Sequence, residues 1–299
     1  MNPQKPNLFI LGVAKSGTTT LADSLRHHPD IFITPWKEPT FFSSDINYAR
    51  GMKWYLDNFF PKSDGYRYRG DASPSYLYFS EKVSRRIQTE MSGENLKFII
   101  VFRNPIDRAY SHYWHNVNRG LHEKLTFEDA LKAEEGRLKS QNRELNDLGR
   151  IRYAYISAGL YVRQLRIFWD IFPKDNFLLL LNEDLRQTSY HQTIQAIQTF
   201  LQVPIVQIDY EHSNPSYKPK SLFFQEIIRK RSLLKELLKL IIPVENRARL
   251  KLSALKMNAA PVAYPQMKPS TREVLKEKFK DEIRELETIL NRDLSAWLK

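Results

Sequence analysis

A loop near the N-terminus has the residue types that hold a phosphate group. Residues 12–21 read G-V-A-K-S-G-T-T-T-L and follow the apolar run at residues 8–11. Gly12 and Gly17 permit a tight turn with exposed backbone N–H groups, and the three threonines that follow can cap a helix whose positive end faces an anion. Lys15 adds a cation inside the loop. This order predicts a buried strand, a phosphate-binding turn and a helix that runs to about residue 28.

The place of the lysine separates this loop from that of the nucleoside triphosphatases. In those enzymes the loop reads G-x-x-x-x-G-K-[ST], and Thr18 stands here where the lysine belongs. They also bind Mg²⁺ through a carboxylate at the end of a neighbouring strand. The best second buried strand, at residues 96–102, ends in Arg103 instead. The pattern therefore favours a doubly phosphorylated nucleotide handled without metal, and a P-loop kinase or other phosphotransferase is the alternative.

Arg103 is the second residue of a further motif, F-R-N-P-I-D-R-A-Y-S-H-Y-W-H. Pro105 suits the first turn of a helix and places Arg103 at the strand tip. Asp107, Ser111 and His115 are spaced by four and share one face of that helix. Ser111 can then donate to a phosphate that the planar guanidinium of Arg103 holds. The alternative is an arginine paired with a carboxylate, a surface serine and a structural histidine.

Glu38 follows the second predicted strand in the segment W-K-E-P-T-F-F. Its aromatic and proline neighbours should remove water from the carboxylate, which raises its proton affinity and suits it to act as a general base. Lys37 would oppose that effect if its ammonium group turned inward. A plain surface glutamate is the alternative.

Apolar runs alternate with helical patterns along the whole chain. Strands are predicted at residues 7–13, 30–34, 66–71, 96–102 and 176–181. Such alternation predicts an α/β fold, a single domain with a central, mostly parallel β-sheet flanked by helices. No linker or repeat divides residues 1–299, and the portion from about 221 has helical patterns. Ligands of open parallel sheets bind at the carboxyl ends of the strands, and Lys15, Glu38 and Arg103 each follow a predicted strand.

Composition limits the other functions. The 299 residues are 42% hydrophobic, enough for a substantial core, and their net charge of +12 attracts anionic ligands. The basic residues are scattered, so we expect no nucleic-acid partner, and a non-enzymatic basic nucleotide or nucleic-acid binder is a second alternative. Without cysteine there is no disulfide or thiolate metal site, and only His112 and His115 have close metal-like spacing. With no signal peptide or membrane-spanning run, we expect a cytoplasmic protein without a bound metal.

Several motifs together resemble the sulfotransferases that use 3′-phosphoadenosine 5′-phosphosulfate (PAPS). They are the loop with H-P-D-I-F after it, K-E-P-T-F-F, G-D-A-S-P-S-Y and F-R-N-P-I-D-R-A-Y-S-H-Y, and the likeness extends to Y-P-Q-M and R-D-L-S-A-W near the end. Bacterial members and the heparan sulfate N-sulfotransferases are the branches that the chain resembles most. The resemblance implies a single α/β domain around a parallel sheet and sulfuryl transfer from PAPS.

The resemblance also implies a role for each matched residue. Lys15 corresponds to the lysine that contacts the 5′-phosphosulfate, and Glu38 to the catalytic base of the N-sulfotransferases. His115 matches a histidine near their reaction centre, and Arg103 and Ser111 fall on the ligands of the 3′-phosphate. The residues implied to wrap the 5′-phosphate are Ser16, Gly17, Thr18, Thr19 and Thr20.

Two positions depart from the heparan branch. Ala72 stands where that branch has a lysine, and A-P-V at residues 260–262 replaces a lysine-glycine-arginine segment. Lys218 and Lys220, in N-P-S-Y-K-P-K-S, could supply the missing contacts around the adenine and the 3′-phosphate, and a solvated basic loop is the alternative. The disulfide of Golgi relatives is impossible here, which favours a cytoplasmic bacterial type. The acceptor, a glycan, lipid or other small molecule with a hydroxyl or amine, and the oligomeric state stay open.

Overall fold

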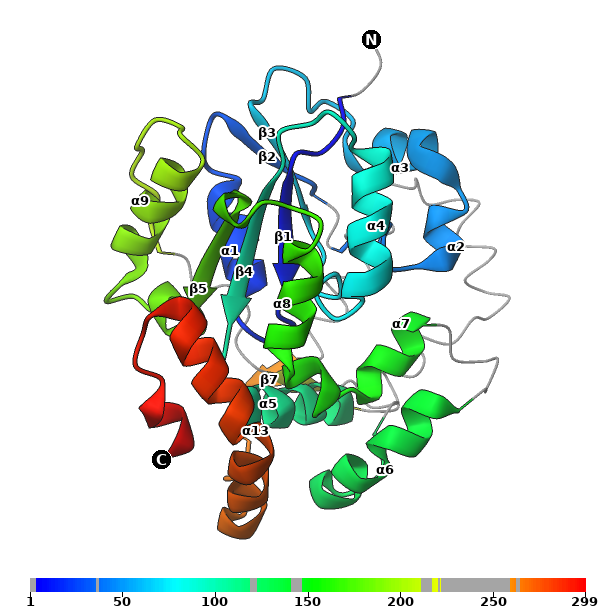
Figure 1. Ribbon diagram of the computed structural model, residues 1–299, viewed down its shortest axis with the longest axis vertical. Helices are drawn as coiled ribbons and strands as arrows, with labels where there is room; N and C mark the ends of the chain where they lie inside the picture. The colour runs from blue at the N-terminus through cyan, green and yellow to red at the C-terminus, as the bar shows by residue number, and fades with distance from the viewer. Residues whose placement is uncertain are drawn as a thin grey trace.

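The computed structural model describes residues 4–35, 38–118, 123–140, 147–210, 217–219, 221, 259–261 and 264–299. Five strands form one parallel sheet in the centre of the protein, in the order β2-β3-β1-β4-β5 (Figure 1). The strands are β1 (Leu8–Gly12), β2 (Ile31–Ile33), β3 (Tyr68–Ala72), β4 (Lys97–Phe102) and β5 (Phe177–Leu181). Each overlaps a predicted strand, so the predicted parallel sheet is confirmed.

The strands are buried on both faces, as parallel strands between two helical layers must be. All residues of β1 are buried, and its side chains alternate between two cores. Phe9 and Leu11 point to one core, whereas Leu8 and Ile10 point to the other. The alternation shows why the run is apolar throughout: neither face of the strand meets water.

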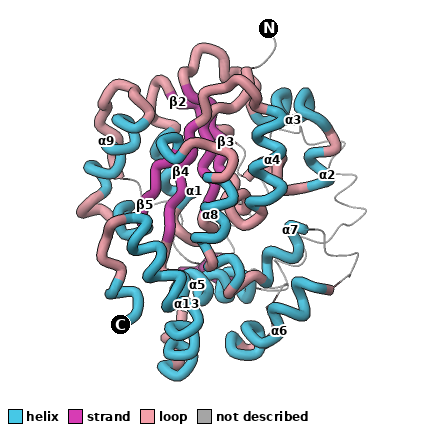
Figure 2. The backbone as a smooth tube through the Cα atoms, viewed as in Figure 1, coloured by secondary structure: helices cyan, strands magenta, loops and turns pink. Residues whose placement is uncertain are grey.

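Helices cover both faces of the sheet (Figure 2). On the side of Leu8 and Ile10, the core is completed by α1 (Thr18–Leu25) and α9 (Tyr190–Phe200). On the side of Phe9 and Leu11, it is completed by α3 (Gly51–Phe59), α4 (Ser80–Glu90), α5 (Pro105–Asn118), α8 (Tyr161–Trp169) and α13 (Pro269–Leu290).

Shorter or more peripheral elements complete the described chain. They are α2 (Asp45–Tyr48), α6 (Phe127–Lys139), α7 (Asp147–Arg150), and the 3₁₀ turns η1 (Ile151–Tyr153), η2 (Ser157–Gly159), η3 (Lys174–Asn176), η4 (Asn182–Leu185) and η5 (Ser295–Leu298). No helix in the described ranges combines the length and apolar character that a bilayer crossing requires.

The carboxyl ends of β1 and β4 mark the place where this fold offers a ligand site. The two strands are neighbours, but the helix after β1 packs on one face of the sheet and the helix after β4 on the other. Open α/β sheets bind ligands where such connections diverge. The predicted phosphate loop and the motif that contains Arg103 both start at this point.

A two-stranded ribbon lies apart from the sheet. Its strands are β6 (Tyr217–Pro219) and β7 (Ala259–Pro261). They pair antiparallel with Lys218 opposite Ala260, and β6 contacts α5. Backbone pairing therefore joins the two segments that we considered for the nucleotide lid. Lys220 and Val262 lie outside the described residues, as do residues 222–258 of the portion predicted to be helical.

Candidate active site

The predicted phosphate loop connects β1 to α1 and bends at Lys15 and Gly17. Both residues have a left-handed backbone, with φ angles of 76° and 87°. Gly17 is the N-cap of α1, and a Cβ atom there would lie 3.1 Å from Nδ2 of Asn182 and 3.3 Å from Cδ1 of Leu185. Both the backbone angle and the neighbouring side chains therefore require glycine at this position.

The threonines after Gly17 do not cap the helix, contrary to our prediction. Thr18 is the first residue of α1, with Thr19 and Thr20 next, and the N-cap Gly17 makes no side-chain hydrogen bond. The cap position takes the left-handed conformation that glycine adopts readily, so the threonines lie in the first turn instead. N–H groups at a helix start lack intrahelical acceptors and attract anions. The first turn can therefore offer them to a phosphate.

Two side chains hold the loop by its carbonyl oxygens. Arg103, after β4, donates from Nη1 to the carbonyl oxygen of Lys15 at 2.7 Å. Asn182, in η4, donates from Nδ2 to the carbonyl oxygen of Ser16 at 2.9 Å. A turn whose carbonyl oxygens are already bonded can present its N–H groups to an anion. The loop is therefore preorganised by contacts from two different strand ends.

Ser16 fits the role of a phosphate ligand. Its side chain is completely buried, and its Oγ has no hydrogen-bond partner among the described residues. A buried polar group left without a partner costs about 1–3 kcal/mol, so such groups are rare in folded proteins. A phosphate oxygen in the loop would supply the missing partner.

Lys15 and His115 meet across 100 residues of sequence. Nζ of Lys15 lies 3.4 Å from Nδ1 of His115, on α5. This contact is a hydrogen bond when the imidazole is neutral and carries its proton on Nε2, because Nδ1 is then the acceptor. A neutral imidazole orients the ammonium group without adding a second positive charge. The structure therefore joins two of the three predicted catalytic residues.

Arg103 and Ser111, the predicted ligands of the 3′-phosphate, lie near the two ends of one motif. Arg103 is partly buried, its carbonyl oxygen accepts from Oη of Tyr161 at 2.9 Å, and its guanidinium group reaches the loop. Ser111 lies on α5, one turn beyond Asp107, which pairs with Arg272 of α13 at 2.5 Å. No hydrogen bond joins Ser111 to Arg103 in the described part of the chain, so their shared role stays a prediction.

Glu38 shares a pocket with the start of α1. The lining includes Glu38, Thr18 and Thr19 of α1, and Ala72 at the end of β3. Glu38 has a left-handed backbone, with a φ angle of 53°. We call residues 38–42 the Glu38 loop. The structure therefore brings the predicted base close to the helix that is predicted to hold the phosphate.

The reason that we gave for the basicity of Glu38 is wrong. Glu38 is exposed, whereas Phe41 and Phe42 of the same loop are completely buried in the core. The aromatic rings turn inward to join the apolar cluster, because that burial is worth more than covering a carboxylate. Trp36 and Lys37, which precede Glu38, lie outside the described residues.

The buried carboxylate of this region is Asp71, which the sequence analysis did not single out. It is completely buried near the end of β3 and accepts hydrogen bonds from Oη of Tyr55 and Tyr76, both at 2.6 Å, and from Oγ of Ser73 at 2.7 Å. Burial raises the pKa of Asp71 to about 6; the three hydroxyl groups oppose this effect, and the charge of Glu38 adds to it. The available signal was an aspartate at a predicted strand end, in G-D-A-S-P-S-Y.

Asn182 is a second residue that the sequence analysis missed. It directly follows β5, in η4, and the C-terminal segment holds η4 in place. Arg292 pairs with both oxygens of Asp184 at 2.7 and 2.9 Å, and Nε1 of Trp297 donates to Oε1 of Glu183 at 3.2 Å. Arg292 and Trp297 belong to the motif R-D-L-S-A-W, which therefore supports the phosphate loop through η4.

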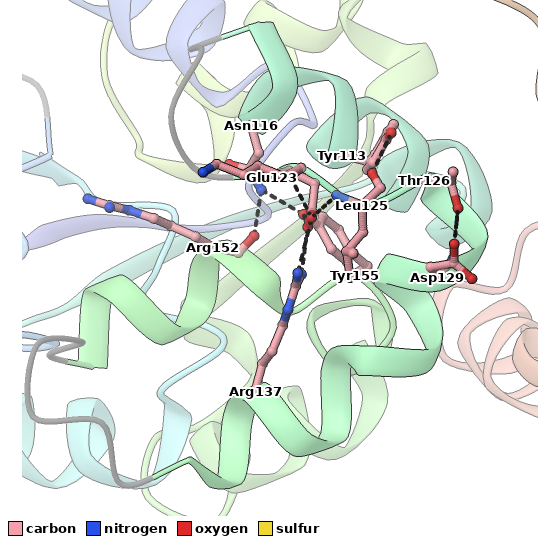
Figure 3. A network of polar contacts seen from close by, with 10 residues as sticks. Tyr113, Asn116, Glu123, Leu125, Thr126, Asp129, Arg137, Arg152 and Tyr155 are labelled. Atoms are coloured by element: carbon pink, nitrogen blue, oxygen red, sulfur yellow. Dashed lines mark hydrogen bonds and ion pairs between the residues drawn. The ribbon is translucent and has the colours of Figure 1, made fainter. Parts of the chain in front are cut away.

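A buried polar network holds the end of α5 that carries His115 (Figure 3). The fully buried carboxylate of Glu123 accepts from both Nη atoms of Arg137 at 2.7 and 3.1 Å, and from Oη of Tyr155 at 2.7 Å. Asn116, next to His115, donates to the same Oη at 3.1 Å. Burial acts to raise the pKa of Glu123, but the bonds from Arg137 and Tyr155 outweigh it and lower that pKa. The network therefore fixes the helix turn beside Lys15.

His112 contacts a buried arginine. Its Nδ1 lies 3.4 Å from Nη1 of the fully buried Arg108. Burial and the Arg108 charge hold the pKa of His112 well below its ordinary value. Within the ranges that the structure describes, no three His, Asp or Glu side chains converge as metal ligands.

Comparison with known sequences points to one family. The family model described as "Sulfotransferase domain" matches residues 5–259. Heparan sulfate glucosamine 3-O-sulfotransferase 5 of Mus musculus is 28% identical over 201 residues, which cover 67% of this chain and 54% of that protein. The bifunctional heparan sulfate N-deacetylase/N-sulfotransferase 1 of Mus musculus is 27% identical over 306 residues, 98% of this chain and 31% of that protein. The chain spans about half the length of the first relative and about a third of the second.

A solved structure is similar over almost the whole chain. The sulfotransferase from Alicyclobacillus acidocaldarius is 26% identical with a TM-score of 0.70, and the match covers 99% of this chain and 100% of that one. These findings confirm the predicted family resemblance and the predicted α/β fold with a phosphate-binding loop. They support the predicted sulfotransferase class and do not favour the kinase alternative.

Proposed function

This chain belongs to the sulfotransferase domain family, and we propose that it moves a sulfuryl group from PAPS to a hydroxyl or amine of a glycan. One observation carries the proposal: Lys15 lies in the loop at the end of β1, in contact with His115, while Arg103 holds its backbone. Fixed cations at a helix start stabilise an anion that forms there. The arrangement suits a reaction in which a phosphate departs.

We assign the 5′ end of the nucleotide to the loop and the 3′-phosphate to the motif on β4 and α5. The buried, unpartnered hydroxyl of Ser16 supports the first assignment, and the place of Arg103 beside the loop supports the second. Ser111 is the proposed second ligand of the 3′-phosphate. The ribbon of β6 and β7, which contacts α5, is the proposed lid over the adenine. The residues assigned to the 5′-phosphate are Ser16, Gly17, Thr18, Thr19 and Thr20.

The proposed reaction is an in-line displacement at sulfur. The acceptor oxygen or nitrogen forms a bond to sulfur while the bond between sulfur and the 5′-phosphate oxygen breaks. Glu38 takes the acceptor proton; it is exposed and lines the pocket beside α1. Lys15 and the first-turn N–H groups of α1 stabilise the charge that grows on the departing phosphate. His115 orients the ammonium group of Lys15.

A glycan is the proposed acceptor class. The names of the relatives compared above place their activity on heparan sulfate, at 28% and 27% identity to this chain. Incubation with labelled PAPS and panels of glycans, lipids and small hydroxyl or amine compounds tests the class. If the label appeared in lipids alone, a lipid would replace the glycan as the proposed acceptor class.

We further propose that the reaction needs no metal and that residues 1–299 act as one domain. We also propose that this chain, which has no cysteine, works in the cytoplasm.

A nucleotide-binding experiment tests the function as a whole. If Arg103 and Ser111 recognise a 3′-phosphate, 3′,5′-diphosphoadenosine at a hundredfold its dissociation constant should stabilise the fold by ~2.7 kcal/mol, a rise in melting temperature of roughly 4 °C. AMP at the same concentration should give a much smaller rise. Equal rises with both nucleotides, or a rise only with magnesium ATP, would contradict the proposal and favour a kinase.

A further inference from the structure

A fully buried carboxylate lies beside the Glu38 loop. Asp71 accepts hydrogen bonds from three hydroxyl groups, those of Tyr55 on α3 and of Ser73 and Tyr76 in the segment after β3. The distances, 2.6 to 2.7 Å, are typical of hydroxyl donors to an ionised acceptor. Burying a charge costs its hydration even when it is well bonded, so packing alone gives no reason to keep an aspartate here.

Two of the three hydroxyl groups also hold the Glu38 loop. Oγ of Ser73 accepts from the N–H of Thr40 at 3.0 Å, and Oη of Tyr76 accepts from the N–H of Phe42 at 3.3 Å. A hydroxyl group has a single proton, and both of these protons go to Asp71. The oxygen lone pairs are therefore left to face the amides of the loop.

Tyr55 differs from the other two donors. Its Oη donates to Asp71, and its ring stacks on Phe41 with the centroids 4.2 Å apart. A phenylalanine in place of Tyr55 would keep the stacked ring and lose one hydrogen bond to Asp71. This substitution weakens the bonding of the carboxylate while leaving both bonds from the loop amides in place.

We propose that Asp71 is the positioning residue of the base: by taking the protons of Ser73 and Tyr76, it directs both oxygens to the Glu38 loop. The inference rests on the role of Glu38 given under the proposed function. Glu38 belongs to this loop, so a shift of the loop backbone moves its carboxylate as well. Asp71 itself does not touch the substrate.

Four variants test the proposal. Asp71→Asn, Ser73→Ala and Tyr76→Phe should each lower kcat by ~10-fold to ~100-fold, because a displacement of about 1 Å at a reacting group can cost that much. KM for PAPS and the affinity for 3′,5′-diphosphoadenosine should change little, since the phosphate loop is untouched. Tyr55→Phe is the matched control: it should lower the melting temperature and change kcat by less than ~3-fold.

Hydrogen exchange gives a readout that does not depend on activity. The amides of Thr40 and Phe42 should exchange at least ~10-fold faster in Asp71→Asn than in the wild type, and should stay protected in Tyr55→Phe. Ser73→Ala and Tyr76→Phe keep the carboxylate and each release one named amide. They therefore decide the question even where Asp71→Asn fails to fold.

Two results would overturn the positioning role. Equal losses of kcat in Tyr55→Phe and Tyr76→Phe would show that Asp71 only stabilises the fold. Full activity in Ser73→Ala and Tyr76→Phe, together with the expected fall of kcat in Glu38→Gln, would contradict the positioning role of Asp71. Glu38 would then remain the proposed base. A fully active Glu38→Gln would instead remove the base from the proposed function, so the two failures are distinguishable.

Discussion

The two loops at the carboxyl end of this sheet are held in different ways. The phosphate loop depends on backbone: a glycine at its bend and two carbonyl oxygens bonded by Arg103 and Asn182. The Glu38 loop depends on side chains, with its amides bonded to hydroxyl groups that Asp71 orients. The first loop is therefore held by its own carbonyl oxygens, whereas the second is held by its amides, through hydroxyl groups that a buried carboxylate orients.

The largest expected effect is on the side of proton transfer. Glu38→Gln keeps the size of the side chain and removes the proton acceptor, so kcat should fall by ~100-fold to ~10,000-fold. The affinity for 3′,5′-diphosphoadenosine should stay nearly unchanged, because the phosphate loop is intact. The acidic limb of the rate profile should vanish, since it reports protonation of the base. Steady-state kinetics from acid to neutral pH measure kcat and the acidic limb, and a binding titration measures the nucleotide affinity.

Two outcomes would break the comparison between the loops. If Glu38→Gln keeps its activity and the acidic limb, the base is another group, and His115 is the next candidate. If nucleotide affinity collapses instead, the Glu38 loop is part of the binding machinery and the two loops do not have separate tasks. Glu94→Gln, after α4, is a control with the same chemical change away from the pocket.

Lys15→Ala should have the next largest effect. It deletes a charge that stabilises the departing phosphate, so kcat should fall by ~100-fold or more, while nucleotide binding weakens less. Lys15→Arg keeps the charge but cannot reproduce the contact to His115, so its kcat should lie between those of the wild type and Lys15→Ala. Single-turnover rates and a titration with 3′,5′-diphosphoadenosine separate the effects. Near-normal turnover in Lys15→Ala would show that this lysine is an ordinary surface residue.

The difference between the loops also explains what sequence alone could predict. Four of the five strands are short apolar runs, β3 alternates polar and apolar residues, and the turn from β1 to α1 is contiguous in sequence, so these elements were predicted near their observed places. The cap of α1 was predicted wrongly: the sequence offered three threonines as caps, but Gly17 occupies the N-cap position. Asn182 was missed because its partner lies 166 residues away and only the assembled sheet brings the two together. Asp71 was missed because its burial and its bond from Tyr55 on α3 become evident only in the folded chain.

The exposure of Glu38 was also not predictable from its neighbours in sequence. Its aromatic neighbours in sequence predicted a buried carboxylate, but adjacent residues in an irregular segment can face opposite ways. Phe41 and Phe42 face the core, and the buried carboxylate comes from β3 instead. The sequence predicted the wrong environment for Glu38, because the environment of a side chain is set by tertiary packing.

The smallest expected effect tests whether the phosphate loop is as self-contained as its sequence suggests. Asn182→Ala removes the bond to the Ser16 carbonyl and frees the loop on one side, so affinity for 3′,5′-diphosphoadenosine should fall by ~10-fold, about the worth of one hydrogen bond. The rate at saturating PAPS should change by less than ~3-fold, because the ammonium group of Lys15 and the carboxylate of Glu38 are still present. Asn58→Ala, which removes a similar side-chain bond to a carbonyl oxygen on α3, is the matched control and should leave affinity unchanged. Unchanged affinity in Asn182→Ala would mean that the backbone alone sets the loop. A loss of kcat as large as that of Lys15→Ala would mean that η4, and the C-terminal motif bonded to it, acts on the chemistry as well.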